Sequence, residues 1–542
     1  MIERHPDILV APVVLPLLAA ALLLLLGHKQ RLKSLVNIAA TALGLFVALT
    51  ILLRASAAPG VSAYLMSNWE APFGIVLVAD RLTALMLVLV GVVSLGAALY
   101  AEATWTRAGV YFHALFQMQL MGLNGAFLTG DLFNLFVFFE VMLAASYGLH
   151  LHGSGWPRVR TGLHYIAVNL VASSLFLVGV AVLYGVVGTL SMADIADKLA
   201  LVPARDRGLL HAGVAILAMA FLIKAAVWPL NAWLVPAYAS TSAPVAAIFA
   251  LMTKVGIYAL VRLWTLFFSS GASAQLGGTV LLYAGLATIA FGALGVLASL
   301  SLGRIAGYSI IVSSGTLVAA LGTGNPTVTS AALFYMLSAT LAVSALFLIV
   351  ELVERIGSDG QRRVPDYDVE PGEDTNLDDE EAPLVGRAFP VSVAQLGLAF
   401  MLCAVLVAGL PPFSGFVAKL SLLTALLSPS GGGPANAATW LLFGLLLVAG
   451  LTTTISLSRA GIRHFWSMAG RIPPRLKVAE AASVLGLIVC CIVLTLWAEP
   501  VLRTTSAAAE GLHSPQTYID AVLSKKSVPR PTGAATEREA LP

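Results

Sequence analysis

Residues 221–262 read FLIKAAVWPLNAWLVPAYASTSAPVAAIFALMTKVGIYALVR. This pattern predicts one hydrophobic helix, a break, and a second hydrophobic helix. Each helix carries one lysine, Lys224 or Lys254, among apolar residues, although a lysine inside a membrane helix costs a few kcal/mol. The break contains four residues that interrupt a helix or are polar: Pro229, Asn231, Pro236 and Pro244. Two such lysines beside a broken helix indicate a route for charge rather than an accident of packing.

The composition of the whole chain agrees with a membrane location. Of 542 residues, 58% are hydrophobic and 11% charged, against about 25% charged in soluble proteins. Many apolar runs have about the 20 residues that cross a bilayer as a helix. We therefore expect an all-α polytopic membrane protein. The first apolar run, 8–26, is long for a signal peptide and is expected to be a retained span.

Composition and motifs also limit the function. The net charge of +3 gives no indication of nucleic acid. Cys403, Cys490 and Cys491 all lie in apolar segments and predict neither a disulfide framework nor a metal site. The chain shows no phosphate loop, catalytic triad or haem signature, so we expect no cofactor and no metal.

Apolar length predicts fourteen spans. They lie near 8–27, 34–54, 77–101, 109–128, 131–152, 162–188, 210–229, 242–268, 277–300, 303–323, 327–352, 389–410 (extending to 428), 438–459 and 479–502. Lysine and arginine in short loops predict their orientation. The cytoplasmic group is expected to contain Lys29, Arg31, Lys33, Arg107, Arg158, Arg160, Arg304, Arg459, Arg463, Arg471, Arg475 and Lys477. Both termini would then lie outside the cytoplasm.

Two segments are polar. Residues 353–388 contain DVEPGEDTNLDDEEAP, which predicts an acidic cytoplasmic loop, most simply a solvated linker. The tail from Thr504 to Pro542 is too short for a domain, and part of it, near 516–524, is expected to be helical.

Four ionisable residues are expected inside spans: Glu140, Lys224, Lys254 and Lys419. Glu140 lies between LFNLFVFF and VMLAASYGL, and a carboxylate there must be protonated or paired. Lys224 is the expected partner, and such a pair can exchange a proton when its separation or hydration changes. The alternative is a static buried ion pair, which is a poor source of stability.

The other two lysines follow similar features. Lys254 precedes Gly256, which is expected to let a helix or water approach, and Arg262 is expected to reach toward the membrane interface. Lys419 follows a second break at Pro411 and Pro412, where freed carbonyls are available to water, hydroxyls or a cation.

The two breaks suggest an internal repeat. Spans seven and twelve are broken and lie five spans apart, so spans 4–8 and 9–13 are expected to be two inverted five-helix repeats. The predicted divisions are 1–108 (spans 1–3), 109–268 (first repeat), 277–459 (second repeat, with the acidic loop) and 460–542 (span 14 and tail). His164 and Ser338 are candidate supporting residues, although an isolated histidine or serine is more often a packing group.

Five segments carry a resemblance to a known family. They are DLFNLFVFFEVMLAASYGL (131–149), KAAVWPLNAWLVPAY (224–238), SAPVAAIFALMTKVGIYALVR (242–262), RIAGYS (304–309) and GLPPFSGFVAKL (409–420). The chain resembles the antiporter-like subunits shared by respiratory complex I, membrane-bound hydrogenases and Mrp antiporters, over about residues 75–460. The sequence of these motifs and the length of the chain most resemble those of the D-type subunits of Mrp (Mnh, Pha) antiporters.

The resemblance implies roles for the four ionisable residues. Glu140, Lys224, Lys254 and Lys419 match the family's glutamate and lysines of proton translocation, coupled to Na⁺ or K⁺ export. Relatives often carry a histidine at the position of Ser338. Because serine does not titrate as histidine does, a chain of titratable groups from Lys254 to Lys419 is interrupted at this position.

The leading hypothesis is therefore a proton-translocating subunit of a multisubunit Na⁺ or K⁺/H⁺ antiporter. Its expected partners are subunits of the A, B, C, E, F and G types in a bacterial inner membrane. No carboxylate cage for a cation is visible, so the cation is expected to cross a neighbouring subunit. The alternative is a proton-pumping subunit of complex I or a related hydrogenase-type complex. A non-transporting scaffold is disfavoured because it would not need intramembrane charges.

Overall fold

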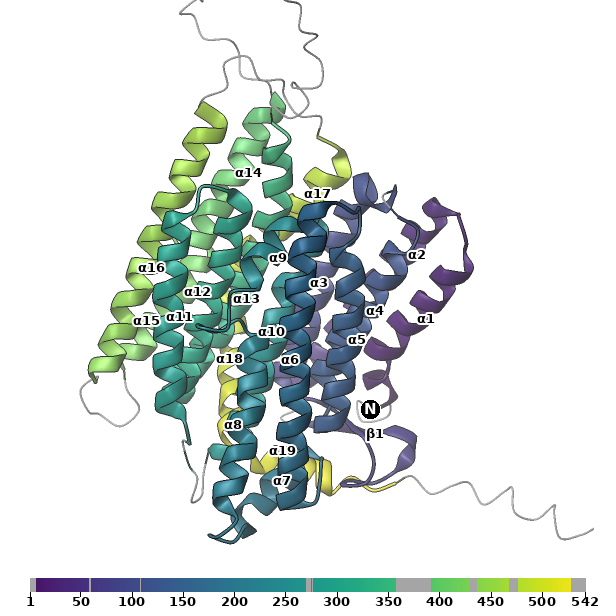
Figure 1. Ribbon diagram of the computed structural model, residues 1–542, viewed down its shortest axis with the longest axis vertical. Coiled ribbons are helices and arrows are strands. Elements are labelled where there is room, and N and C mark those ends of the chain that lie inside the picture. Colours follow the sequence, from purple (N-terminus) through teal and green to yellow (C-terminus); the bar gives the residue numbers. More distant parts are fainter. Residues whose placement is uncertain are drawn as a thin grey trace, which may run out of the picture.

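The computed structural model of the chain is a bundle of long helices packed side by side (Figure 1). It describes residues 6–57, 60–107, 109–269, 274, 276–356, 391–428, 436–466 and 476–527. Most of the predicted acidic loop, together with Arg471 and Arg475, lies outside the described residues. Within the described residues the chain is helical apart from one small hairpin of two strands.

The elements follow one another in this order. The first half contains α1 (Ala11–Leu25), α2 (Gln30–Ala57), β1 (Ser62–Leu65), β2 (Val76–Ala79), α3 (Arg81–Thr104), α4 (Phe112–Leu128), α5 (Leu132–His150), α6 (Trp156–Val187), α7 (Met192–Lys198), α8 (Arg207–Lys224), α9 (Leu234–Ser240) and α10 (Ala243–Phe268). The second half contains α11 (Gly278–Ala298), α12 (Leu302–Gly322), α13 (Pro326–Glu354), α14 (Val391–Ala408), α15 (Ser414–Leu427), α16 (Ala437–Gly461), α17 (Val478–Leu496), α18 (Ala498–His513) and α19 (Gln516–Leu523).

The helices have the lengths and composition of membrane spans. Among the described residues, 12 helices are long and apolar enough to cross a bilayer, and α1 and α15 are shorter apolar helices. This confirms a multi-pass membrane protein. The predicted span 242–268 matches α10, and 303–323 matches α12, to within one residue at each end. The total of fourteen spans, the inverted repeats and the four divisions of the chain stay predictions.

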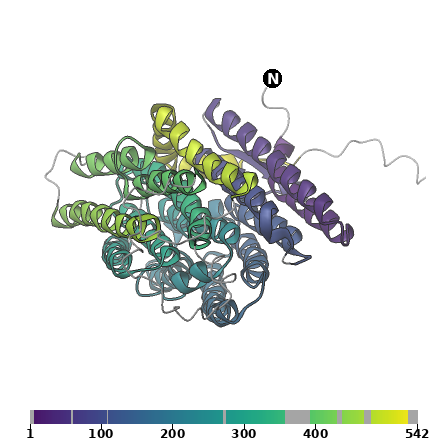
Figure 2. The same ribbon diagram turned by 90° about the horizontal axis from the view of Figure 1, so that it is seen from above.

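Three helices form the interior. The most apolar window is 100% buried in α10, 94% in α13 and 89% in α12, whereas only 22% is buried in α2. Figure 2 shows α1 and α2 at the edge of the bundle. A helix that is apolar on all sides belongs in a core, so α10 is the helix around which the others pack.

Small residues let neighbouring helices approach closely. A Cβ added at Gly285 on α11 would overlap the backbone of Ala319 on α12, and one added at Gly315 would lie 2.8 Å from the nitrogen of Ile289. Membrane helices associate through such contacts because lipid provides no hydrophobic drive between them.

Both breaks lie where the sequence predicts them. Helix α8 ends at Lys224 and α9 begins at Leu234, with Pro229 between them. Helix α14 ends at Ala408 and α15 begins at Ser414, with Pro411 and Pro412 between them.

The two other prolines of the predicted break differ in their places. Pro236 lies between the helices of Lys224 and Lys254, as predicted, but inside the short helix α9. Pro244 lies in the first turn of α10, where a missing N–H is tolerated, so its predicted contribution to the break is wrong.

The start of the third predicted span is also wrong. Val76–Ala79 is a strand paired with Ser62–Leu65, and α3 begins only at Arg81, with the Asp80 carboxylate accepting a hydrogen bond from the Thr83 N–H. A short apolar run joined to a helix cannot be assigned by periodicity alone.

The C-terminal region is more helical than expected. The last predicted span corresponds to α17, and the chain continues as α18 to His513, so the start of the polar tail at Thr504 lies in a helix. The expected helix near 516–524 is confirmed by α19.

The described ends of the chain meet at one end of the bundle, where Figure 1 places the N-terminus, β1 and α19. The Ser527 N–H donates a hydrogen bond of 2.8 Å to Glu70, which together with the Ser527 hydroxyl lowers the pKa of that exposed carboxyl.

Replacement of Gly285 by alanine should destabilise the α11–α12 contact. The added methyl group cannot fit against the Ala319 backbone, and overpacking of this kind costs about 1–3 kcal/mol. Gly444→Ala on α16 is the control, because a Cβ there meets nothing within 4 Å. We expect the first variant alone to lower the thermal melting point of the purified protein, and equal melting points would contradict the packing described here.

Candidate functional site

The four predicted ionisable residues lie on four different helices. Glu140 is on α5, Lys224 is the last residue of α8, Lys254 is midway along α10 and Lys419 is on α15. Lys224 and Lys254 are 4% and 2% exposed. Lys224 ends its helix, where unpaired carbonyls and the helix dipole favour a positive charge.

Glu140 and Lys224 do not form a direct ion pair. The Ser173 hydroxyl donates a short hydrogen bond to Glu140 Oε1. Lys224 Nζ instead lies 4.8 Å from the centroid of the Phe139 ring, and no hydrogen-bond partner for it exists among the described residues. The carboxylate still acts on the lysine electrostatically. The predicted partners are therefore neighbours without a direct ion pair, and the Lys224 ammonium lies over the Phe139 ring.

Lys254 is linked to α12 and lies near the end of α8. Its Nζ donates a hydrogen bond of 2.9 Å to Ser313 Oγ. Gly256, half a turn further along α10, allows the backbone of Lys224 to approach, because a Cβ there would lie 3.2 Å from the Lys224 carbonyl carbon. The expected role of Gly256 in close approach is thus confirmed, and it brings the helices of both lysines together.

Lys419 binds the end of the other broken helix. Its Nζ donates a hydrogen bond of 2.6 Å to the Ala408 carbonyl, which is the last residue of α14. Carbonyls in the last turn of a helix have no partner within the helix. The break at Pro411 and Pro412 therefore provides the acceptor that holds this lysine.

A small cavity lies beside Lys419. Its volume is about 30 Å³, which exceeds the roughly 10–15 Å³ that one water molecule needs. Ser338 lines it and donates a hydrogen bond of 2.9 Å to Ser414 Oγ at the start of α15. The other polar residues of the lining are Ser309, Tyr335 and Thr453. Ser338 thus lies where a water can reach Lys419.

Tyr335 lies between the Lys254–Ser313 contact and the cavity beside Lys419. Its side chain lies beside Ser313, the partner of Lys254, and beside Thr316, and it also lines the cavity of Lys419. Sequence reasoning missed Tyr335 as a site residue. The available signal was its position three residues before Ser338, which places both on one face of a helix.

Within the part of the chain that the structure describes, the other predicted site residues form no hydrogen bond or ion pair with the four ionisable side chains. His164 is exposed on α6, and no contact with the four ionisable residues supports its predicted role. Pro229 lies in a turn whose Trp228 N–H donates a hydrogen bond of 2.9 Å to Thr288 on α11. Pro411 and Pro412 are exposed in the second break.

Arg262 has a buried partner that the sequence does not reveal. It is 5% exposed, and its guanidinium donates two hydrogen bonds, of 2.6 and 2.8 Å, to the Asp80 carboxylate. Its charge also lies 5.3 Å from the Tyr518 ring of α19. The pair could not be found from sequence because Asp80 and Tyr518 are far from Arg262 along the chain. Among the described residues no group of three metal-binding side chains occurs.

Comparison with known proteins gives one consistent result. Residues 129–432 match the family described as NADH:quinone oxidoreductase/Mrp antiporter, TM. The chain is 50% identical over 535 residues to the D-type subunit of a probable K⁺/H⁺ antiporter of Rhizobium meliloti (strain 1021), covering 97% of this chain and 99% of that relative. It is 32% identical over 527 residues to the D-type subunit of the Na⁺/H⁺ antiporter of Bacillus subtilis (strain 168), covering 95% and 99%.

Solved structures agree with the sequence relatives. A chain of the Mrp complex from Dietzia sp. DQ12-45-1b is 28% identical, with a TM-score of 0.81 over 96% of this chain and 100% of that one. A chain of respiratory complex I from Thermus thermophilus is 21% identical, with a TM-score of 0.75 over 94% and 99%. At that identity the second likeness shows the fold alone.

Loss of the Ser313 hydroxyl should slow proton movement through Lys254. Ser313→Ala removes the hydrogen bond that holds the ammonium group toward Tyr335, and we expect cation-driven proton flux in everted vesicles to fall about tenfold. Ser314→Ala is the matched control, since its neighbouring hydroxyl is buried without a partner among the described residues. Similar fluxes for both variants would exclude this role of Ser313.

Proposed function

Because this chain belongs to the NADH:quinone oxidoreductase/Mrp antiporter family, we propose that it is the D-type, proton-translocating subunit of a multisubunit Na⁺ or K⁺/H⁺ antiporter. It is a transporter subunit rather than a catalytic enzyme. The proton motive force drives cation efflux from the cell through the complex. One observation supports the proposed proton route: Lys224 and Lys254 are buried on helices that approach closely at Gly256, and Ser313, Tyr335 and a cavity lie between Lys254 and Lys419.

The route begins at Glu140 and Lys224. Lys224 at the free end of α8 lies over the Phe139 ring, next to Glu140, and a small movement exchanges the ring for the carboxylate. Contact with the carboxylate favours the ammonium form of the lysine, and separation favours release of the proton. The break before α9 supports this step because it leaves the end of α8 without a rigid continuation.

The proton then passes from Lys224 toward Lys254 and across to Lys419. The close approach at Gly256 brings the backbone of Lys224 to α10. Lys254, the next proton carrier, is oriented toward α12 by its hydrogen bond to Ser313. Tyr335 and a water in the cavity beside Ser338 bridge the remaining gap to Lys419. Lys419 loads or releases the proton at the second broken helix.

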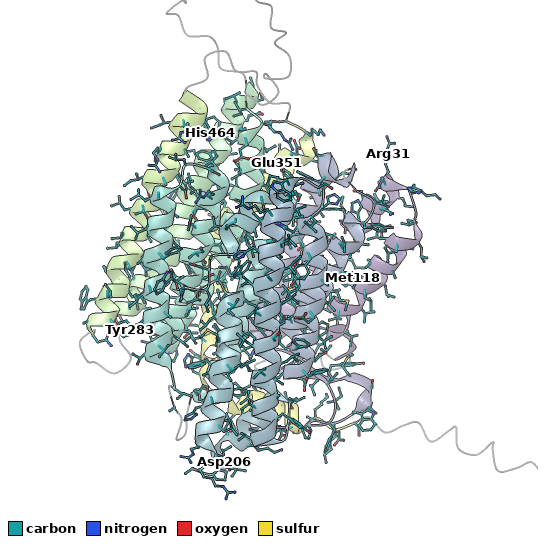
Figure 3. The ribbon with its side chains drawn as sticks, in the orientation of Figure 1. Arg31, Met118, Asp206, Tyr283, Glu351 and His464 are labelled. Carbon is teal, nitrogen blue, oxygen red and sulfur yellow. The ribbon has the colours of Figure 1, made fainter. Side chains whose placement is uncertain are left out.

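We also propose the arrangement in the cell. The chain lies in a bacterial inner membrane, with α4–α10 (109–268) and α11–α16 (277–459) as two inverted repeats. The end of the bundle that carries Arg31, Glu351 and His464 faces the cytoplasm, and the end with Asp206 and Tyr283 faces the periplasm (Figure 3). Both termini are then periplasmic. The partners are the A-, B-, C-, E-, F- and G-type subunits.

The alternative function, a proton-pumping subunit of complex I, has weaker support. Complex I shares the fold with this chain, but the relatives that match nearly its whole length at 30% identity or more carry antiporter names. The same four residues would move protons in either complex, so their geometry does not favour the alternative.

Glu140→Gln should abolish antiport without preventing assembly. The neutral amide keeps the shape and the contact with Ser173 but cannot take part in the exchange with Lys224. The measurement is cation-induced dequenching of a pH-sensitive dye in everted vesicles, together with recovery of the whole complex by affinity purification. Glu499→Gln, at an exposed ion pair on α18, is the control. Full dequenching with Glu140→Gln would refute the proposed role.

Reporter fusions test the orientation. Alkaline phosphatase, which folds only in the periplasm, should be active when fused after Ser527 and inactive when fused after Ile356, because these residues lie at opposite ends of the bundle. A fluorescent protein that matures in the cytoplasm should give the opposite pattern. The reverse result for both reporters would invert the proposed orientation.

A further inference from the structure

A second set of buried polar side chains lies far from the lysines. Helices α1, α2 and α4 pack against one another at the edge of the bundle, and Figure 3 places Met118 of α4 near the middle of its height. Four polar residues are buried between these helices and take no part in the proton route. They are Asn37, Thr41, Gln117 and Asn124, which are 0%, 3%, 0% and 8% exposed.

A proline in α1 supplies a free backbone oxygen here. Pro16 lies inside the helix and has no N–H, so the carbonyl of Pro12 loses its partner within the helix. The side chain of Asn124 on α4 replaces it, donating a hydrogen bond of 2.8 Å from Nδ2 to Pro12 O. This bond fixes the orientation of the amide, because the reverse orientation would place two oxygens together.

The amide of Gln117 is oriented in the same way. Its Nε2 donates to Asn37 O at 3.2 Å, to Asn37 Oδ1 at 2.8 Å and to Thr41 Oγ1 at 3.0 Å. The Thr41 hydroxyl donates to Asn37 O at 2.8 Å. Gln117 Oε1 is left buried, with no hydrogen-bond partner among the described residues. A buried acceptor without a partner costs free energy, about 1–3 kcal/mol.

These groups meet at a cavity. Pro12, Pro16, Thr41, Gln117 and Asn124 line a space of about 20 Å³ together with apolar residues, enough for one particle of the size of a water molecule. The Thr41 hydroxyl hydrogen and one amide hydrogen of Asn124 are donated to backbone oxygens, and the Gln117 amide nitrogen donates to Asn37 and Thr41. The lining residues also carry four acceptor oxygens: the Pro12 carbonyl, the amide oxygens of Gln117 and Asn124, and the Thr41 hydroxyl.

We propose that this cavity between α1, α2 and α4 binds one monovalent cation, Na⁺ or K⁺, on neutral oxygens. The proposal deepens the proposed function and rests on it, since it gives this subunit a site for the exchanged cation as well as for the proton. Rings of carbonyl oxygens replace the hydration shell of such ions in selective pores without any carboxylate, and backbone carbonyls at unwound parts of transporter helices coordinate Na⁺.

The buried charge on α2 does not occupy the cavity. Lys33 is eight residues from Thr41 on α2, roughly 12 Å by helix rise, and its Nζ donates a hydrogen bond of 3.2 Å to Val110 O at the end of the bundle. Glu102, on the same side, accepts a short hydrogen bond from Ser34. The site therefore holds its ion through dipoles and is open to Na⁺ and K⁺ alike.

The test measures binding directly, on the purified complete complex with radioactive Na⁺ or Rb⁺ as the probe. Gln117→Leu and Asn124→Leu should each raise the half-saturating concentration at this site about tenfold. Gln119→Leu is the matched control, because Gln119 is also fully buried on α4 with no partner for its amide among the described residues but does not line the cavity. It should bind like the unaltered complex.

Pro16→Ala separates the loss of a ligand from damage to the fold. Alanine restores the N–H that bonds Pro12 O within α1, so the helix gains a bond while the cavity loses an oxygen. We expect weaker cation binding at undiminished thermal stability. Unchanged binding in Pro16→Ala and Gln117→Leu would overturn the proposal and leave the cavity as a water site only.

Glu140→Gln keeps the two proposals distinguishable. In that variant the cation should bind with unchanged affinity although antiport is lost. Retained antiport would overturn the proton route through Glu140, and the cation site would still be decided by the binding measurements.

Discussion

The burial of α10 along its whole length is the constraint on which the rest of the structure depends. Solvent does not reach the polar groups of this helix, so each must find a partner within the protein. Thr253 and Thr265 bond carbonyls of α10 itself, and three longer side chains reach other elements. Lys254 finds Ser313 on α12, Tyr258 donates to the Phe127 carbonyl at 2.7 Å, and Arg262 finds Asp80 before α3. These residues recur every four positions on one face of α10. The central helix thus fixes the positions of α3, α4 and α12 through polar contacts that lipid cannot replace.

The features predicted from sequence were those that one segment reveals by itself. A lysine or glutamate inside an apolar run is conspicuous, and so are the prolines of the two breaks, so the four ionisable residues and both interruptions were found. Tyr335, the Asp80–Arg262 pair and the cavities were missed because each depends on residues of different helices. The sequence predicts helix from residue 77, within the hairpin strand Val76–Ala79, because a few apolar residues before a helix have no period of their own.

Free backbone carbonyls are used in two different ways in this bundle. At the second break the carbonyl of Ala408 holds the ammonium group of Lys419, a side chain that can carry a proton. In α1 the Pro12 carbonyl, released by Pro16, accepts a hydrogen bond from the Asn124 amide, a group that does not titrate. Neutral oxygens bind a metal cation without taking up a proton, whereas a lysine side chain takes up a proton and releases it. In Figure 1, α1 and α15 lie on opposite sides of α10, so the most deeply buried helix of the chain stands between the two sites.

The contact of Tyr518 with Arg262 has a consequence for biosynthesis. Asp80 is already in the membrane when α10 is inserted, so the buried arginine has a counter-charge from the start. The aromatic ring that covers its other side belongs to α19, which is synthesised long after α10. Until then this end of the central helix stays uncovered. Helix α19 therefore completes the cover over the Asp80–Arg262 pair, and a chain that terminates before it would leave that pair partly solvated.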